Sequence, residues 1–571
     1  MRFLLTFTFL FLTFTVNKLV CALPVDEDAV TKRIKKQQQL KREQRQRERD
    51  ARRSINTPIE TPKLKQESNL ASGGHCFEIS TIKLDGATLL SDEEKAELFK
   101  GFIGECLGLK QINALLKRVT AHYMQRGYIT TRAYLSQQNL SLGTLTIIVQ
   151  EGELTAFGWG GESGLSDRQL WLTMPITSGS KLNLRDVEQG LDQLNRLQSN
   201  SVKTEMIPGD QQGQTQILLK NNLAKRWAGS VSYDNSGQKN TGKYQQGVNL
   251  SGDNILGLAD FLSVNYQSDT SSKKLDESSV SHSIHYDIPY GYWNFDFDLS
   301  YFRYHSQYTS GPTTFVSHGR TRSQSIRTSY LFHRDQGSKN GVRFTLSRNQ
   351  SQNYIQDVIL DSSKKTASAK LEVYREQFIE NGRWQLSGSF HKGLRLFGAL
   401  ADEEQLPNSP RAEFEKTNVN FNYSKQFSVF EIPLNWDADL RTQYSSDILF
   451  GGQQFSLGGL YTIRGYKENG LFGNSGALLR QQLSYNLQDY NPFGSFKHLG
   501  QWKLFVAYDI GRVKNKEPTS KSFHGLSGWA LGFSSGGGIW SWSMTYAQPL
   551  DKPNGISPKS NQFDFTLSAN F

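Results

Sequence analysis

A single arginine stands among glycine and aromatic residues in one stretch of this 571-residue sequence. The stretch Gly458–Tyr466 reads GGLYTIRGY and lies inside a glycine-rich segment from Gly451 to Gly476. Glycines allow the backbone to pack closely, and a guanidinium removed from water needs a carboxylate partner. These residues predict a loop that tucks inward and pairs Arg464 with an acidic side chain. An ordinary glycine-rich surface loop is the alternative.

Cysteine is the second residue type with a predictable chemistry. Of the three cysteines, Cys21 lies in a targeting segment, which leaves Cys76 and Cys106. Two cysteines in an oxidising compartment predict a disulfide, whose closed loop would stabilise the fold by about 3.5 kcal/mol. A metal site is not expected, because two thiols with only His75 nearby are too few ligands.

Residues 1–22 predict a secretory signal peptide. The apolar run Phe3–Val16 follows a positive residue and is too short to span a bilayer. Ala22 fits cleavage before Leu23. Lipid modification of Cys21 is the alternative, and the residue before it is a poor fit. The sequence therefore indicates a secreted or cell-envelope protein.

Most of the positive charge lies in residues 23–53. From Lys32 to Arg53, eleven Lys and Arg residues stand against three Asp and Glu, a net of +8 out of +11 for the chain. The composition predicts a solvated basic helix or a disordered tail, or a polar helix inside a water-filled lumen. No aromatic residue is present to stack on bases, so nucleic-acid binding is not expected. Residues 54–74 predict a flexible linker.

Residues 75–222 predict two small α/β units in tandem, 75–151 and 152–222. In the first, strands at Phe77–Leu84, Tyr128–Leu135 and Thr144–Gln150 accompany an amphipathic helix whose apolar face begins at Ile112. The second unit repeats the order, which is β-α-α-β-β in each. Neither unit shows a nucleophile–base pair, histidines with metal spacing or a phosphate-binding loop. We therefore expect neither an enzyme nor a cofactor.

From Ala224 onward the hydrophobic period changes to two. In Tyr292–Phe302 and in Gln562–Phe571, apolar residues alternate with polar ones. Sixteen such runs predict a 16-stranded antiparallel membrane β-barrel over residues 223–571, with lipid outside and water inside. The mean hydropathy of −0.54 gives no hint of a helical membrane protein but is compatible with strands that are apolar on one face.

Together, these elements and several motifs resemble a known family, the two-partner secretion transporters of the haemolysin-activator and contact-dependent-inhibition type. The resemblance covers nearly the whole chain after the signal peptide, and the α/β units are similar to POTRA domains. The matching residues are Tyr233-Asp234-Asn235-Ser236-Gly237, Thr241-Gly242, Asp253-Asn254, Gln138-Asn139-Leu140, Gly143, Glu151-Gly152, Ile207-Pro208-Gly209, Gly213 and Ile463-Arg464-Gly465-Tyr466.

The resemblance implies a pore in the Gram-negative outer membrane with both POTRA domains in the periplasm. They would capture a large unfolded exoprotein (a toxin, haemolysin or adhesin) by adding its strand to a sheet edge, and the barrel would export it without ATP. Helix 23–53 would plug the resting lumen. Outer-membrane lipid and the barrel assembly machinery are further implied partners, and no cofactor, metal or nucleic acid is implied.

The resemblance also implies that loop 447–475 folds into the lumen, where its arginine meets an aspartate of the inner wall. Asp509 fits this role, since the alternation of Trp502–Ile510 turns it away from the apolar face. Ala507 departs from the family, which usually has an aromatic residue there. The packing around Arg464 therefore stays open, whereas its pairing with Asp509 is expected.

A second departure is Gln482, where the family often has glutamate. Two other functions are also compatible with parts of the sequence. A barrel-insertion factor of the same superfamily shares the Arg-Gly-Tyr loop, but it usually carries more POTRA repeats and no plug helix. A diffusion porin needs neither POTRA domains nor a linker and helix.

Overall fold

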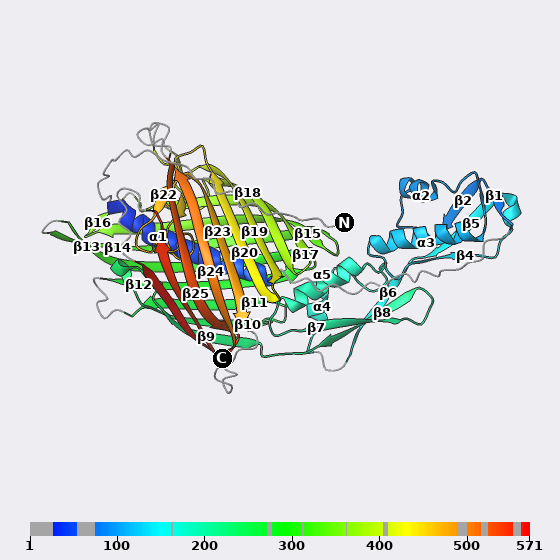
Figure 1. The fold of residues 1–571 in the computed structure, drawn as a ribbon, viewed down its shortest axis with the longest axis horizontal. Helices are drawn as coiled ribbons and strands as arrows, with labels where there is room; N and C mark the ends of the chain where they lie inside the picture. Colours follow the sequence, from blue (N-terminus) through cyan, green and yellow to red (C-terminus); the bar gives the residue numbers. More distant parts are fainter. Residues whose placement is uncertain are drawn as a thin grey trace.

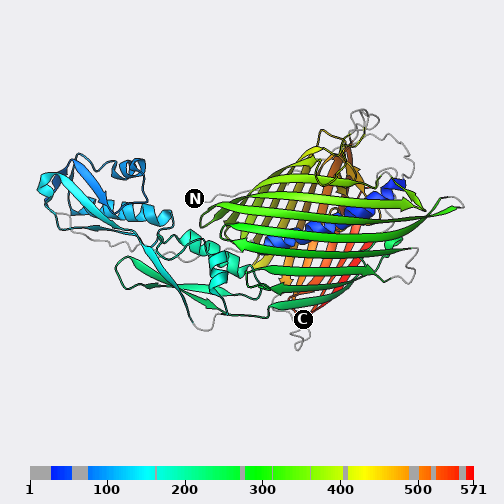
Figure 2. The same ribbon diagram turned by 180° about the vertical axis from the view of Figure 1, so that it is seen from behind.

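A computed structural model describes residues 27–53, 75–160, 164–270, 277–310, 313–360, 362–402, 409–487, 500–515, 523–551 and 561–571. The predicted signal peptide and linker lie outside the described residues. The described parts form a closed barrel that encloses one long helix and carries two α/β units at one end (Figure 1; seen from behind in Figure 2). No helix among them is both long enough and apolar enough to cross a membrane.

Sixteen antiparallel strands in the described residues close the barrel, which confirms the predicted fold class. The strands are β9 (Trp227–Asp234), β10 (Gln245–Asp253), β11 (Phe261–Asp269), β12 (Ser278–Tyr290), β13 (Trp293–Ser310), β14 (Thr313–Arg334), β15 (Ser338–Ile355), β17 (Lys365–Ile379), β18 (Gly382–Leu394), β19 (Glu415–Val429), β20 (Ile432–Tyr444), β23 (Ser475–Leu487), β24 (Gln501–Lys514), β25 (Phe523–Gly536), β26 (Trp540–Pro549) and β27 (Gln562–Asn570). The two-residue β16 (Val358–Ile359) pairs only with the end of β15, and β27 closes the sheet against β9.

Alternation of apolar and polar residues is what makes these strands a barrel wall. In β13, Phe297 and Leu299 are exposed on the outer face, whereas Asp296 is buried on the inner face. Two-residue turns join β12 to β13, β17 to β18, and β19 to β20, all at the end that carries the α/β units. Short turns are typical of the periplasmic end of outer-membrane barrels.

Helix α1 (Glu27–Arg53) runs through the barrel interior (Figures 1 and 2). It is strongly charged, and within its described side chains only Ile34 and Leu40 are buried apolar residues. A helix of this composition requires polar surroundings. The inner wall supplies them, because the inward phase of the strands is polar.

The first α/β unit contains β1 (Phe77–Ile79), β2 (Thr81–Asp85), α2 (Asp92–Phe99), β3 (Glu105–Leu107), α3 (Leu109–Gln125), β4 (Arg132–Leu135), the short 3₁₀ helix η1 (Leu140–Leu142) and β5 (Thr144–Gln150). The strand expected at Phe77–Leu84 is split into β1 and β2, because β1 pairs with β3 whereas β2 joins β5. Strand β4 begins four residues later than expected, since the chain turns after α3 before it meets β5. Helix α3 packs Ile112, Leu115 and Val119 into the core.

The second α/β unit contains β6 (Glu153–Trp159), α4 (Asp167–Thr173), α5 (Leu184–Asn195), β7 (Val202–Pro208) and β8 (Gln214–Asn221). Its sheet has the order β6-β8-β7, and α5 fills one face with Val187, Leu191 and Leu194. Helices α4 and α5 lie between this sheet and the barrel rim (Figure 1). The second unit therefore connects the first unit to the barrel.

Cys76 and Cys106 form a disulfide in the first unit, with their Cα atoms 5.3 Å apart. The bond joins the chain just before β1 to β3, its partner strand. Replacing both cysteines by serine should destabilise this unit by about 3.5 kcal/mol, because the unfolded chain gains the entropy of an open loop. Hydrogen exchange should show faster exchange in β1, β3 and α3, with barrel strands unchanged as the internal control. Unaltered exchange in the first unit would contradict the estimate.

Candidate functional site

The loop between β20 and β23 folds into the lumen. It forms a short hairpin of β21 (Phe455–Leu457) and β22 (Leu471–Gly473). Loop and wall share a buried apolar cluster made of Leu457, Ile463, Tyr466, Leu478, Val513 and Leu526. The cluster holds the loop in place, because undocking would expose this surface to lumen water.

Close approach between loop and wall requires glycine at two positions. Gly465 has a φ of +96°, and a Cβ there would lie 2.8 Å from the backbone nitrogen of Pro549. On the wall, a Cβ at Gly528 would lie 2.4 Å from the carbonyl oxygen of Arg464. A larger residue at either position would force the backbones apart, so the Arg-Gly-Tyr motif depends on this contact.

Arg464 and Asp509 meet inside the barrel. The guanidinium donates from Nε to Oδ2 at 2.7 Å and from Nη2 to Oδ1 at 2.6 Å, and the backbone N–H of Arg464 donates to Oδ2 at 3.0 Å. Asp509 is 1% exposed. Three donors from one residue therefore satisfy a carboxylate that water does not reach, which makes the pair directional as well as electrostatic.

The two residues that depart from the family pattern, Gln482 and Ala507, are cross-strand partners on the inner wall. Gln482 accepts a hydrogen bond from Nη1 at 3.2 Å, which a glutamate could also do. Ala507 is buried beside Ala530 and offers no ring. Phe505 stands two residues earlier and also faces inward. The guanidinium carbon of Arg464 lies 5.9 Å from the centre of the Phe505 ring. In this chain, the aromatic contact of Arg464 is thus made from position 505, one inward position before Ala507.

Loop residues after Arg464 contact the strands that close the barrel. The Tyr466 hydroxyl lies 3.0 Å from the carbonyl oxygen of Ser527 and accepts the N–H of Asp551 at 3.0 Å. The Lys467 ammonium lies 3.5 Å from Asp564 on β27 and donates to the carbonyl of Asn235, just after β9. The loop therefore bridges the two strands at which the sheet closes.

Helix α1 is held by polar side chains of the wall. Lys41 donates to Gln267 at 2.6 Å, and Arg49 pairs with Asp298 at 3.0 Å. The Asp50 carboxylate accepts hydrogen bonds from both terminal nitrogens of Arg327, at 2.9 and 3.1 Å. These groups lie on β11, β13 and β14, so one side of the barrel carries most of the helix contacts in the described chain.

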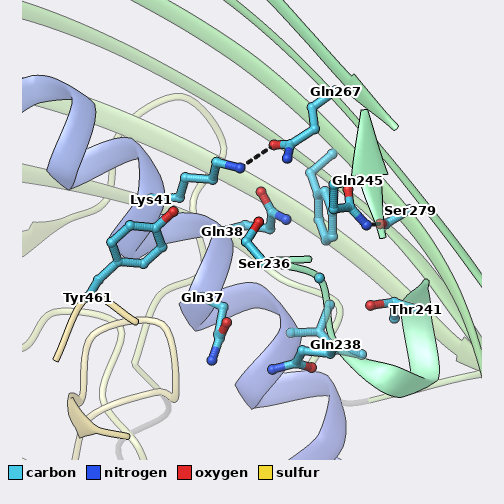
Figure 3. A pocket seen from close by; sticks show the side chains of 13 residues that line it. Gln37, Gln38, Lys41, Ser236, Gln238, Thr241, Gln245, Gln267, Ser279 and Tyr461 are labelled. Atoms are coloured by element: carbon cyan, nitrogen blue, oxygen red, sulfur yellow. Dashed lines mark hydrogen bonds between the residues drawn. The ribbon is translucent and has the colours of Figure 1, made fainter. Parts of the chain in front are cut away.

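Helix α1 also contacts the inward loop. Gln37 donates to the carbonyl of Lys467 at 3.3 Å, and Arg33 donates to that of Glu468. A mostly polar pocket remains between helix, wall and loop, and Figure 3 shows Lys41 reaching Gln267 across it with the ring of Tyr461 nearby. The wall, the loop and the helix therefore meet in polar surroundings.

The second α/β unit is attached to the barrel by buried ion pairs. Arg334 of β14 lies 3.3 Å from Glu188 and 2.5 Å from Asp192, both on α5. Lys339 of β15 donates to the same Asp192 at 2.6 Å. Pairs of this kind are costly to break singly, since an unpaired buried charge remains. The unit is therefore held in a defined orientation to the lumen.

Turn residues of the barrel complete this attachment. Gln193 donates to the carbonyl of Gly291 at 2.9 Å, and the N–H of Gly291 donates to the carbonyl of Leu172 at 2.7 Å. The Tyr292 hydroxyl donates to Asp186 at 2.5 Å. Burial raises the pKa of Asp186, and the hydrogen bond from Tyr292 opposes that rise.

A buried histidine lies between the contacts that hold α1 and those that hold the second α/β unit. His285 lies 2.9 Å from Asp298 and 3.0 Å from Asp287, and Asp296 is 3.9 Å away. His285, Asp287 and Asp296 form the only group in the described chain whose spacing could hold a metal ion. Arg196 of the second unit pairs with Asp287, and Arg327 pairs with Asp296, so arginines already compensate both carboxylates. The cluster is best described as an ion network.

Sequence reasoning identified Arg464 and Asp509, but not this network. Its partners come from α1, the second unit and β12–β14, which are far apart in the sequence. The available signal was weak: Asp296 and Asp298 occupy the polar phase of the predicted strand Tyr292–Phe302. The alternation along a strand predicts that a polar side chain faces the lumen, but it does not predict which residue the side chain contacts there.

Comparison with known families gives matches along the described chain. Residues 213–535 match the model of the haemolysin secretion/activation proteins ShlB/FhaC/HecB. Residues 77–152 match a ShlB-type POTRA domain, and residues 154–208 match a second POTRA model. The two α/β units therefore correspond to POTRA domains.

Curated relatives resemble nearly the whole chain. The outer membrane transporter CdiB of Dickeya dadantii is 31% identical over 532 residues, covering 93% of this chain and 92% of the relative. The hemolysin transporter protein HpmB of Proteus mirabilis is 31% identical, covering 84% of this chain and 81% of the relative.

Solved structures agree with these matches. CdiB from Escherichia coli superposes with a TM-score of 0.85 at 30% identity, covering 97% of this chain and all of that one. CdiB from Acinetobacter baumannii has the same fold, with a TM-score of 0.80 at 21% identity over 96% of this chain and all of that one. The chain therefore belongs to the ShlB/FhaC/HecB family, the outer-membrane transporters of two-partner secretion, with its POTRA domains in the periplasm.

Proposed function

We propose that this transporter exports a large exoprotein in unfolded form through the lumen that helix α1 occupies. The main observation behind this proposal is that polar side chains of the inner wall hold α1. Most of its described contacts are hydrogen bonds and ion pairs, which water can replace at low cost when the helix leaves. A helix with so few buried apolar residues is also soluble outside the barrel.

Release of α1 fits the length of chain behind it. Residues 54–74 separate the helix from the first POTRA domain, and a fully extended segment of this length spans about 70 Å. This reach allows the helix to leave the lumen toward the periplasm while it stays tethered. The vacated, polar lumen then suits an unfolded chain, whose backbone groups need water or polar partners.

The POTRA domains would receive the exoprotein first. In the described sheet of the second domain, β7 has a partner strand on one side only, β8. An unfolded segment can extend such an edge through backbone hydrogen bonds. Buried ion pairs to Arg334 and Lys339 keep this domain next to the lumen, so a bound segment starts close to the pore.

The proposal includes a membrane-inserted pore that needs no ATP. Folding of the exoprotein at the cell surface would draw the chain outward. Outer-membrane lipid would cover the apolar outer face, where residues such as Leu299 and Phe297 are exposed. The barrel assembly machinery would insert the protein. We further propose 1–22 as signal peptide, 54–74 as linker, and 447–475 as the inward loop.

Deleting Asp26–Arg53 should raise single-channel conductance while leaving exoprotein secretion largely intact, because the wall groups can be solvated by lumen water. A finer test is Asp50→Ala, which removes the bidentate partner of Arg327 and should increase the frequency of open events in planar bilayers. Glu48→Ala is the matched control, since Glu48 is exposed and accepts a hydrogen bond from Gln44 of the same helix. Unchanged conductance of the deletion variant would show that α1 does not obstruct the pore.

A soluble fragment spanning Gly74–Lys220 should capture the unfolded N-terminal segment of the exoprotein and not the folded exoprotein. In the full-length chain, a photo-crosslinking amino acid at Lys203, on the edge strand β7, should yield adducts during secretion. The control position is Leu371, which faces lipid. If the fragment binds neither form and Lys203 gives no adduct, recognition belongs to the barrel.

Arg464→Ala should leave a barrel that assembles but secretes poorly, because Asp509 keeps a buried charge without its main partner. Breaking one side of such a pair costs about 3–5 kcal/mol, which is enough to mobilise the loop. Secretion and heat-modifiability of Arg464→Ala and Asp509→Ala are the measurements. Asp437→Ala is the control, since Asp437 also faces the lumen but bonds Ser424 of the wall.

Exchanging the charges should not restore secretion. An arginine at position 509 would face two donors, the backbone N–H of Arg464 and the guanidinium of Arg480, whose Nε lies 3.5 Å from Asp509. Full secretion by both single variants would refute a role for the pair in transport. Secretion lost only together with assembly would assign the pair to barrel stability alone.

A further inference from the structure

Trp171 is an exposed aromatic residue on the POTRA domain next to the barrel. It lies on α4 and is 65% exposed, whereas its neighbours Leu170 and Leu172 are buried. Exposed indoles are enriched at interfaces and in membrane-interface belts, where one end of the side chain is apolar and the other is wet.

The neighbour of Trp171 is a lipid-facing residue of the barrel. The two rings of Trp171 and Tyr290 lie 5.7 Å apart at 62°, an edge-to-face contact. Tyr290 ends β12 on the same outward phase as Ile284, and its cross-strand partner is Trp293. Trp293 in turn stacks on Tyr330 of β14 at 4.4 Å. Trp171 therefore extends a band of outward-facing aromatic residues at the periplasmic rim.

Such bands mark the interface between lipid and water in outer-membrane barrels. The position of Trp171 relative to the band is fixed, because Leu172 accepts the N–H of Gly291 in the turn right after Tyr290. Gln193 of α5 holds the same turn through the carbonyl of Gly291. The second POTRA domain therefore cannot move away from the rim without breaking the hydrogen bonds to the N–H and to the carbonyl of Gly291.

We propose that α4 docks on the phospholipid headgroups of the periplasmic leaflet through Trp171, with Arg168 as its anionic-group contact. Arg168 is exposed and stands three residues before Trp171, which places both on one side of the helix. The indole lies at headgroup depth, and the guanidinium suits lipid phosphate. Lipid is the occupant that the geometry favours, because the surface is continuous with one already covered by lipid.

This contact adds a membrane attachment to the protein attachments of the second POTRA domain. The ion pairs of α5 fix the domain to the barrel from the lumen side, and α4 fixes it from the outer side. The orientation of the open edge of β7 is then determined by lipid as well as by protein.

The test uses the full-length mature chain with Trp171→Cys, labelled with an environment-sensitive fluorophore and reconstituted into phospholipid vesicles. The native cysteines are bonded to each other, so the label is confined to the new thiol. Lipids carrying a nitroxide at the headgroup should quench the label strongly, and lipids with a nitroxide deep in the acyl chain should quench it weakly. Phe297→Cys, in the middle of a lipid-facing strand, should show the opposite order.

Leu142→Cys provides the matched water-exposed control, since Leu142 is 78% exposed on the first POTRA domain. Quenching at position 171 should exceed that at position 142 severalfold, and Arg168→Glu should reduce it whereas Arg168→Lys should not. Equal quenching at 171 and 142 would overturn the proposal. Protection of the label only on adding exoprotein, or only at high protein-to-lipid ratio, would assign the surface to exoprotein or to a second copy instead.

Discussion

Closure of the sheet between β27 and β9 is the constraint on which the rest of the molecule depends. A barrel in lipid must close, because each unpaired backbone group in hydrocarbon costs several kcal/mol. Yet β27 pairs with β9 over five positions, whereas β13 and β14 pair over eighteen. The Asn235 side chain extends this short pairing of β27 with β9. Its amide donates to the carbonyl oxygen of Phe563 at 2.8 Å and accepts the N–H of Phe565 at 2.9 Å. Lys467 binds the Asn235 carbonyl, so loop docking and closure support each other.

Charges in the lumen are compensated in a chain rather than in isolated pairs. At one end, Arg196 of the second POTRA domain pairs with Asp287, and at the other end Arg49 of α1 pairs with Asp298. The ring of His285 contacts both aspartates and joins the two pairs. If α1 left the lumen, as proposed, Asp298 would keep His285 and gain lumen water, in which a charge is screened. The Arg196–Asp287 contact lies at the other end of the chain and loses no partner. Exit of the helix would therefore leave the direct contacts between the domain and the barrel in place.

Local patterns in the sequence were sufficient to predict the barrel and the two α/β units, but not the split of the first strand into β1 and β2. A period of two turns every second side chain inward, which is why Asp509 could be placed on the inner wall and why sixteen strands could be counted. The same patterns could not position Phe505 under Arg464, because the choice between inward positions depends on how neighbouring strands pack. Arg196 and Trp171 were missed for a related reason. Their partners belong to another domain, and side-chain periodicity carries no information about how two domains meet.

The attachments of the inward loop respond differently to the proposed exit of α1. Arg33 and Gln37 donate to loop carbonyls, and each of these bonds would be exchanged for water at about 0.5–1.5 kcal/mol. The Arg464–Asp509 pair and the cluster around Ile463 face the wall. They involve no residue of the helix, so exit of α1 would leave the buried apolar surface and the paired charge intact. We therefore expect the loop to stay docked, and to keep its contacts with β9 and β27, if α1 leaves the lumen.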